Sequence, residues 1–448
     1  MKMLSSQLLL LLTVSIGAAE PDQGRVISSA GAVLPERARV EAVNNMLRDR
    51  LDNLLPSLMR ETGIDMWLVI NREYAEDPVY LTLVPEPVFA ARRTTMLVFY
   101  DRGAGKGVER LTVSRYPFKG YYDAAWEGGA LDQQWTRLAQ VIKERDPKRI
   151  AINVSRDWPF ADGLSHALHE RLNAALDPPL RQRLVSAENL VVRWMETRTE
   201  MELQSYPSIV ALARAAIAEA FSEKVITPGV TTTDDVAWYI RQRYADRGLP
   251  VWFMPDVNLQ RQGLKCEAAT DFCGEDGVIQ RGDVLHTDVG ITYLRLNTDT
   301  QEMGYVLKIG ETEVPEGLQQ ALATGNRWQD ILTGNFMTGR TGNEILAATL
   351  ASSKRESILS STYTHPLGFF GHAAGPTIGM WDNQGPTAVL GDWKLRASTV
   401  YAIEGNVKIA VPEWKGQLVQ IKLEQSALFD GQKVHYLAGR QTRWHVVR

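Results

Sequence analysis

The sequence predicts a two-domain protein, an α/β domain followed by an α+β domain. The chain has 448 residues, more than one hydrophobic core usually serves. Strand-like and helix-like segments alternate over residues 36–190, as they do in α/β domains. Beyond about residue 283, strand-like segments dominate. We therefore place one domain at residues 36–190 and the other at residues 197–440.

Composition and charge narrow the class of protein. Hydrophobic residues make up 44% of the chain and charged residues 23%, which is typical of a globular protein. The net charge of −4 gives no reason to expect nucleic acid or an anionic membrane as partner, because phosphate binding needs clustered Lys and Arg.

Residues 1–19 have the pattern of a secretory signal peptide. Lys2 precedes an apolar stretch at residues 8–16, and Gly17-Ala18-Ala19 is a small-residue cleavage site. The alternative is a membrane anchor, but about a dozen apolar residues are short for a hydrocarbon core of ~30 Å. We expect an exported protein, periplasmic or extracellular, without a stable membrane anchor after cleavage.

In the first domain, leucines at helical spacing predict a helix that ends at Gly63. They are Leu47, Leu51, Leu54, Leu55 and Leu58. Three short segments rich in apolar and β-branched residues are predicted strands: "DMWLVI", "TTMLVFY" and "RIAINVS" (149–155).

The second domain is predicted to begin with two helices. The first is Ala-rich, at about residues 208–224, and the second lies in "TTTDDVAWYIRQRYADRGL" with Thr residues as N-cap candidates. After Gly248 helices should become sparse. The predicted strands are at residues 283–296, 303–309, 398–409 and 417–428.

Several of these apolar strands carry carboxylates, although Asp is depleted in strands and a buried unpaired carboxylate is very costly. "VLHTDVGITYLRLNTDTQ" contains Asp288 and Asp299, "YAIEGNV" contains Glu404, and "VQIKLEQSALF" contains Glu424. Strand alternation places His286 on the same face as Asp288, and Lys422 on the same face as Glu424. "THPLGFFGHAAGPTIG" adds His365 and His372.

Four carboxylates brought together repel one another unless protons or cations neutralise them. With one imidazole they form a mostly oxygen ligand set, which suits Mn, Fe, Co or Zn, and two ions rather than one if the carboxylates bridge. The alternative is that each residue lies at the surface or forms an ordinary ion pair.

The order Asp288, Asp299, His365, Glu404, Glu424 resembles the ligand series of the M24 "pita-bread" metallopeptidases, which include Xaa-Pro aminopeptidases, prolidases and methionine aminopeptidases. "HTDVG", "NTDTQ", "HPLG", "YAIEGN" and "IKLEQ" carry the resemblance. It covers residues 197–440 and implies a pita-bread fold there. Residues 36–190 resemble the creatinase-type amino-terminal domain more weakly.

The resemblance implies two divalent ions, with manganese favoured and zinc, cobalt or iron as alternatives. Asp288 would bind one ion and His365 the other, and the remaining three carboxylates would hold both. A bridging water would supply hydroxide as the nucleophile. Glu404 would move a proton to the leaving amine, and His372 would contact the substrate.

The chain departs from the family pattern at residues that touch substrate. No His occurs in residues 249–285, and Ser361 stands four positions before His365 where the family has a His. His286 is an additional imidazole that could hydrogen-bond a ligand carboxylate or act as an acid or base. Lys422 stands where the family commonly has Arg, and it is a second candidate for such a supporting role.

Two further features have alternative interpretations. Cys266 and Cys273 are the only cysteines, and in an exported protein they predict a local disulfide rather than a pair of metal ligands. The aromatic residues at 252, 253, 369 and 370 could form the wall of an apolar substrate pocket, or they could be ordinary core.

The function that best fits these patterns is an exported dinuclear metallopeptidase acting on short peptides, of the Xaa-Pro aminopeptidase or dipeptidase type. One alternative is a metalloenzyme, hydrolase or lyase, acting on a small metabolite. The other is a non-catalytic binding protein with the same fold. Relatives often form dimers, so a homodimer is also expected.

Overall fold

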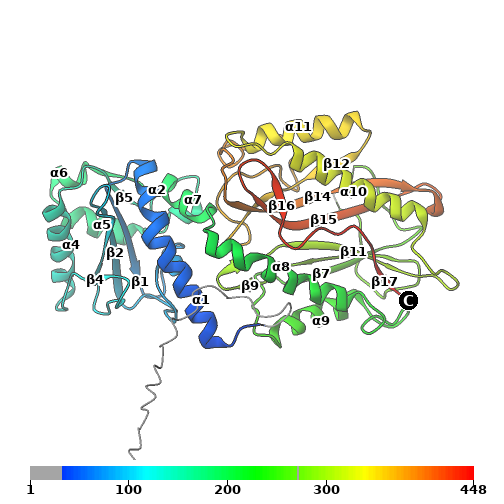
Figure 1. Ribbon diagram of the computed structural model, residues 1–448, viewed down its shortest axis with the longest axis horizontal. Coiled ribbons are helices and arrows are strands. Elements are labelled where there is room, and N and C mark those ends of the chain that lie inside the picture. Colours follow the sequence, from blue (N-terminus) through cyan, green and yellow to red (C-terminus); the bar gives the residue numbers. More distant parts are fainter. Residues whose placement is uncertain (1–32, 270–271) are drawn as a thin grey trace, which may run out of the picture.

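The computed structural model describes residues 33–269 and 272–448, and its strands form two main sheets (Figure 1). The first has six strands in the order β4-β3-β2-β1-β5-β6. The second has nine, along the path β12-β14-β15-β11-β8-β7 with β13, β16 and β17 at its margins. The predicted fold class, an α/β domain followed by an α+β domain, is confirmed. The predicted signal peptide at residues 1–19 lies outside the described residues.

The first sheet mixes parallel and antiparallel pairs and is covered by helices. The helix predicted from the leucines at residues 47–58 is formed by three consecutive helical segments, α1 (Glu36–Asp49), η1 (Arg50–Leu54) and α2 (Leu55–Thr62). It ends at Gly63, whose φ of 66° is readily adopted by glycine. The strands are β1 (Met66–Arg72), β2 (Thr94–Asp101), β3 (Val108–Val113), β4 (Asp123–Ala124), β5 (Ile150–Ile152) and β6 (Leu184–Ser186). The other helices are α3 (Tyr80–Leu83), α4 (Leu131–Arg145), η2 (Pro159–Ala161), α5 (His166–Ala175), α6 (Pro178–Arg181) and α7 (Glu188–Glu196).

The second sheet is built around a long hairpin and accompanied by two helix pairs. Its nine strands are β7 (Asp256–Gln260), β8 (Val284–Val289), β11 (Thr300–Val306), β12 (Leu359–Thr362), β13 (His365–Leu367), β14 (Thr399–Val411), β15 (Gln417–Phe429), β16 (Val434–Tyr436) and β17 (His445–Val447). Two short strands, β9 (Thr292–Tyr293) and β10 (Leu296–Asn297), pair with each other in a separate small sheet. The helices are α8 (Glu200–Ala220), α9 (Thr233–Ala245), α10 (Glu316–Gly334), α11 (Gly342–Arg355) and the short η3 (Pro412–Trp414). Figure 1 shows α8 and α9 along the β7 and β11 part of the sheet, and α10 and α11 along the β14 part.

The expectation that helices become sparse after residue 248 is wrong. Both α10 and α11 lie beyond that point. The start of α11 carries a capping box, in which Thr341 accepts from the backbone N–H of Glu344 and the Glu344 side chain accepts from that of Thr341. The apolar faces of α10 and α11 are buried against the second sheet, and Trp328 of α10 is fully buried.

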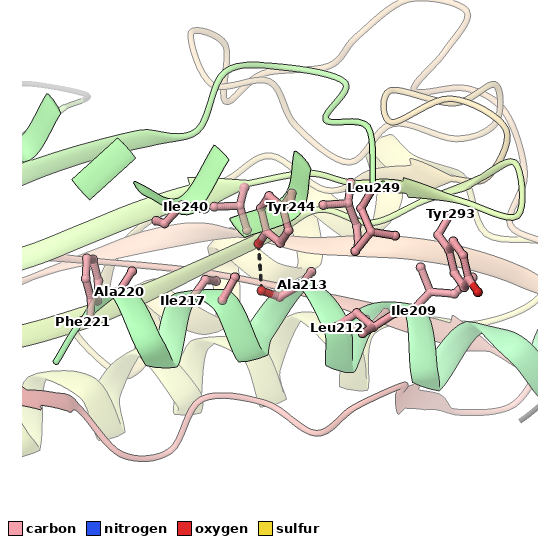
Figure 2. Close-up of a cluster of buried hydrophobic side chains, with 14 of the residues drawn as sticks. Ile209, Leu212, Ala213, Ile217, Ala220, Phe221, Ile240, Tyr244, Leu249 and Tyr293 are labelled. Atoms are coloured by element: carbon pink, nitrogen blue, oxygen red, sulfur yellow. Dashed lines mark hydrogen bonds between the residues drawn. The ribbon is translucent and has the colours of Figure 1, made fainter. Parts of the chain in front are cut away.

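Helices α8 and α9 cover a hydrophobic cluster beneath the β7–β8–β11 strands (Figure 2). Ile217 of α8 lies in this cluster near Ile240 of α9, and Ile209 of α8 lies at its other end, near Tyr293. The hydroxyl group of Tyr244 donates to the Ala213 carbonyl at 2.8 Å, which satisfies a polar group inside this apolar layer. This packing holds β8 rigidly in place.

A buried charged cluster connects the two sheets. Arg50 of η1 pairs with Glu202 of α8 at 3.0 Å, and Arg198 lies 3.6 Å from the same carboxylate. The guanidinium groups of both arginines lie against the Phe369 ring, at 4.8 and 4.7 Å from its centroid. Phe369 is therefore packed between the two domains, which favours the second of the two interpretations, ordinary core, for this ring. No described helix is long and apolar enough to span a membrane.

Replacing Glu202 should destabilise the protein strongly. Glu202→Gln would leave two buried guanidinium groups without the carboxylate they share, so we expect the free energy of unfolding to fall by about 3–5 kcal/mol. Denaturant unfolding measures this. The exposed ion pair Arg37–Glu41 provides the control, because Glu41→Gln should cost under about 0.5 kcal/mol. Equal effects of the two substitutions would contradict the role of the cluster.

Candidate metal centre

The register of the second sheet places its carboxylates in one row. Asp288 of β8 lies opposite Gln301 of β11, and Gln301 lies opposite Glu424 of β15. Glu424 in turn lies opposite Glu404 of β14. Side chains directly opposite each other in antiparallel strands are about 5 Å apart, so four adjacent strands deliver three carboxylates and one amide to the same place.

Two neighbouring segments complete the cluster. Asp299 directly precedes β11, and His365 begins β13 opposite Ala402, two residues before Glu404. The His365 Nε2 atom lies 3.6 Å from an oxygen of Asp299 and 3.6 Å from one of Glu404. An oxygen of Glu424 lies 3.7 Å from the same nitrogen. The structure thus brings all five predicted ligands together, in overlapping sets whose ligand atoms lie within 4.8 Å of one another.

Several of these atoms are buried and face no hydrogen-bond donor. They are Asp288 Oδ1, Asp299 Oδ1, Glu424 Oε1 and His365 Nε2. Leaving a buried polar atom without a partner costs free energy, and the gathering of four such atoms in overlapping sets is the geometry expected around bound cations. Three carboxylates and an imidazole suit a divalent transition-metal ion, so the residues fit a metal centre.

The electrostatics agree with this fit. Burial, followed by the charges of neighbouring carboxylates, raises the pKa values of Asp288, Asp299 and Glu424 well above their ordinary range. Burial raises the pKa of Glu404 to about 8. Without cations the cluster would therefore hold protons near neutral pH. Burial lowers the pKa of His365 to about 4, which keeps its imidazole neutral and able to bind a metal.

His372 lies at the open rim of the cluster. Its side chain is exposed, and its ring centroid lies 4.7 Å from that of His365 and 5.2 Å from that of Trp252. A ring nitrogen lies within 4.8 Å of ligand atoms of Asp299 and His365. Although the residue as a whole is exposed, partial desolvation of its ring, together with the neighbouring His365, lowers the pKa of His372 to about 4, so the imidazole is neutral near pH 7. It can present a donor toward a molecule entering the site.

His286 and Lys422 lie next to the ligand cluster, and their side chains bond amide groups, not ligand carboxylates. The Nε2 atom of His286 lies 2.9 Å from Gln301 Oε1, so its bond runs to this amide rather than to a ligand carboxylate. The Lys422 Nζ atom lies 3.5 Å from Asn258 Oδ1 and 3.2 Å from the centroid of the Phe272 ring. Burial lowers the pKa of Lys422 to about 7, against the opposing charges of nearby aspartates.

The sequence patterns did not single out Gln301. Its amide nitrogen donates to Glu404 Oε1 at 2.8 Å and to Glu424 Oε2 at 3.1 Å. Gln301 lies two residues after Asp299, at the start of β11, which pairs with the ligand-bearing strands β8 and β15. Its closeness in sequence to Asp299 is the one feature that could have marked it as part of the site. A glutamine in a strand is not distinctive by itself, and the two glutamates to which it donates are more than a hundred residues away in the chain.

The two cysteines form a disulfide, with their Cα atoms 5.1 Å apart, so they are not metal ligands. The described residues next to the two cysteines contact the β14–β15 hairpin. There the backbone N–H of Cys273 donates to Gln420 Oε1 at 2.7 Å, and Lys408 donates to the Glu267 carbonyl at 3.1 Å. Phe272, next to Cys273, lies against the Lys422 ammonium group.

The comparisons with known proteins agree with this geometry. The model of metallopeptidase family M24 matches residues 204–428. No curated protein matched the chain at the sequence level. Among solved structures, the X-Pro aminopeptidase from Thermotoga maritima MSB8 is 18% identical with a TM-score of 0.62, and the match covers 87% of this chain and 100% of that one.

Other solved structures share the same fold. The Xaa-Pro dipeptidase from Bacillus anthracis is 15% identical with a TM-score of 0.59, and the match covers 92% of this chain and 100% of that one. The N-terminal domain of the FACT complex subunit SPT16 from Cicer arietinum is 11% identical with a TM-score of 0.52, covering 92% and 98%. The family model spans half of the chain and encloses all five converging residues, and the chain therefore belongs to metallopeptidase family M24.

Proposed function

We propose that this family member is a dinuclear, divalent-metal-dependent peptidase acting on short peptides, of the Xaa-Pro aminopeptidase or dipeptidase type. The observation that carries the proposal is the convergence of four buried ligand atoms that have no hydrogen-bond donor. Asp288, Asp299, His365, Glu404 and Glu424 would hold the ions. Manganese is the ion we favour, with zinc, cobalt and iron as alternatives.

Bound ions would polarise the scissile carbonyl and lower the pKa of an attacking water. Glu404 is suited to move the proton, because its side chain is 18% exposed whereas that of Glu424 is 1% exposed. Its carboxylate can therefore reach both the attacking water and the leaving amine, accepting a proton from the first and delivering it to the second.

The rim of the site supports binding of a peptide carbonyl. The neutral imidazole of His372 can donate to the carbonyl oxygen as it gains charge. Trp252 supports that ring from the side, and its own Nε1 donates to the Thr298 carbonyl at 2.8 Å, which fixes its orientation. Phe370 is partly exposed and lies 4.9 Å from Phe160 of the first domain, so an apolar surface continues beyond His372.

A second candidate function keeps the metal centre and changes the substrate. The absence of His from residues 249–285 and the presence of Ser361 remove groups that bind peptide in the family, which favours a metalloenzyme acting on a small metabolite. Hydrolysis of dipeptides and Xaa-Pro tripeptides, compared with small carboxylate metabolites, separates the two. A non-catalytic binding protein is less favoured, because all five ligand positions are retained.

We also propose that the protein is exported and forms a homodimer. The signal-like residues 1–19 support export to the periplasm or the extracellular space, and a disulfide suits either oxidising compartment. The family resemblance supports the dimer.

Removing the metal should abolish peptidase activity. We expect the purified protein to bind about two equivalents of divalent metal and to lose hydrolysis of short peptides when chelated, with recovery on addition of Mn²⁺. Metal analysis and a peptide-library cleavage assay measure this. Peptide hydrolysis that persists unchanged after complete demetallation would refute the proposal.

Replacing Glu404 should remove proton transfer. Glu404→Gln is expected to lower kcat by about 10²–10⁴-fold, because the amide cannot accept or deliver the proton. Steady-state kinetics on a cleaved peptide measure this, with Glu313→Gln as the control at an exposed position outside the site. A Glu404→Gln enzyme with unaltered kcat would rule out this role.

The metal-free protein should lose stability as the pH rises. The folded-state pKa of Glu404 is raised from 4.5 to about 8, and those of the other three ligand carboxyl groups are raised as well. The stability they contribute is complete below about pH 4 and is lost as the pH rises through the folded-state values. Unfolding of chelated protein between about pH 5 and 9 should show this fall, and Mn²⁺ should flatten it. A rising stability across that window would contradict the assignment.

A further inference from the structure

A buried chain of polar side chains lies behind the glutamates of the site. Gln301 is 5% exposed, and His286 and Asn258 are each 2% exposed. Gln301 donates to Glu404 and Glu424, His286 bonds Gln301, and Asn258 lies 3.1 Å from the other ring nitrogen of His286. Because the side chains of Gln301, His286 and Asn258 are buried, their donors are expected to meet acceptors within the protein.

Counting donors and acceptors fixes the direction of each bond. The two N–H groups of Gln301 meet the two glutamates, so its Oε1 atom must accept from His286 Nε2. The Nδ1 atom of His286 then carries no proton and accepts from Asn258 Nδ2. The second N–H of Asn258 meets Asp256 Oδ2 at 3.0 Å. One imidazole tautomer and one orientation of each amide satisfy the whole chain.

These bonds divide the oxygens of each glutamate into two kinds. Glu404 Oε1 and Glu424 Oε2 accept from Gln301. The remaining oxygens, Glu404 Oε2 and Glu424 Oε1, lie 3.6 and 3.7 Å from His365 Nε2, within the cluster of ligand atoms. The amide therefore holds one oxygen of each carboxylate and leaves the other directed at the place where a cation would bind.

We propose that Gln301 is a positioning residue for Glu404 and Glu424, and that His286 holds its amide in the donating orientation. The inference deepens the proposed metallopeptidase function and rests on it. A primary amide does not release or accept a proton near neutral pH, so the chain sets the orientation of the carboxylates and does not conduct protons. The extra imidazole at position 286 thus acts through Gln301, without contacting substrate.

Substitutions that keep side-chain volume test the proposal. Gln301→Met removes both donors, and His286→Phe removes the ring nitrogens. Removing a partner that orients metal ligands typically weakens metal binding ten- to a hundredfold, and we expect that loss for Mn²⁺ binding to the metal-free full-length chain, measured by calorimetry. We also expect kcat to fall more than KM rises. His286→Gln, which can still donate to Gln301, should recover part of the affinity.

A double-mutant cycle tests the order of action. If His286 acts through Gln301, the double variant should bind Mn²⁺ about as weakly as Gln301→Met alone. The matched control is Gln134→Met, which removes a buried amide whose nitrogen donates to the Thr94 and Val113 carbonyls in the first domain. It should lower the melting temperature without changing Mn²⁺ affinity.

The outcomes separate this proposal from the proposed function. Unchanged Mn²⁺ affinity in Gln301→Met would overturn the positioning role, while metal-dependent peptide cleavage by the parent would still stand. Strictly additive losses in the double variant would overturn the claim that His286 acts through Gln301. If Gln134→Met lost as much Mn²⁺ affinity as Gln301→Met, the loss would reflect general destabilisation of the fold, and the proposal would be overturned. A parent protein that binds Mn²⁺ but cleaves no peptide would contradict the proposed peptidase function and leave the positioning role of Gln301 unaffected.

Discussion

The structure depends on the mutual repulsion of four buried carboxylates and on what relieves it. Asp288, Asp299, Glu404 and Glu424 come from distant parts of the chain, yet the sheet register delivers them to one place. Burying such a group alone costs several kcal/mol, and each neighbouring charge adds to the cost. Binding of divalent cations would neutralise the four carboxylate charges, and the same cations would activate water and substrate for hydrolysis.

The remainder of the fold holds the cluster rigid. The helix pairs α8–α9 and α10–α11 bury the apolar side chains of the strands that carry the carboxylates, so those strands cannot slip without exposing their cores. The first domain reaches this region through Arg50, which lies with Arg198 of the second domain against the ring of Phe369. Phe369 lies between His365 and His372 in the chain, so domain packing fixes the segment that carries both imidazoles.

Much of the site was predictable from local patterns, and the rest was not. Period-two alternation placed Asp288, Glu404 and Glu424 on apolar strands because that signal is local. The link between His286 and Gln301 was not predictable, since it depends on which strands are neighbours. Helix α11 was missed although the capping box at Thr341 and Glu344 is visible in the sequence. The pairing of Phe369 with two arginines requires the contact between the domains, which no local pattern reports.

The central claim is that paired divalent cations occupy the carboxylate cluster. The most direct measurement is a crystal structure of the full-length protein grown with Mn²⁺, with anomalous scattering recorded to locate the ions. We expect two anomalous peaks about 3.5–4 Å apart, bound by Asp288, Asp299, His365, Glu404 and Glu424. Diffraction data that showed these five side chains around no anomalous peak, in crystals soaked to saturation with manganese, would contradict it.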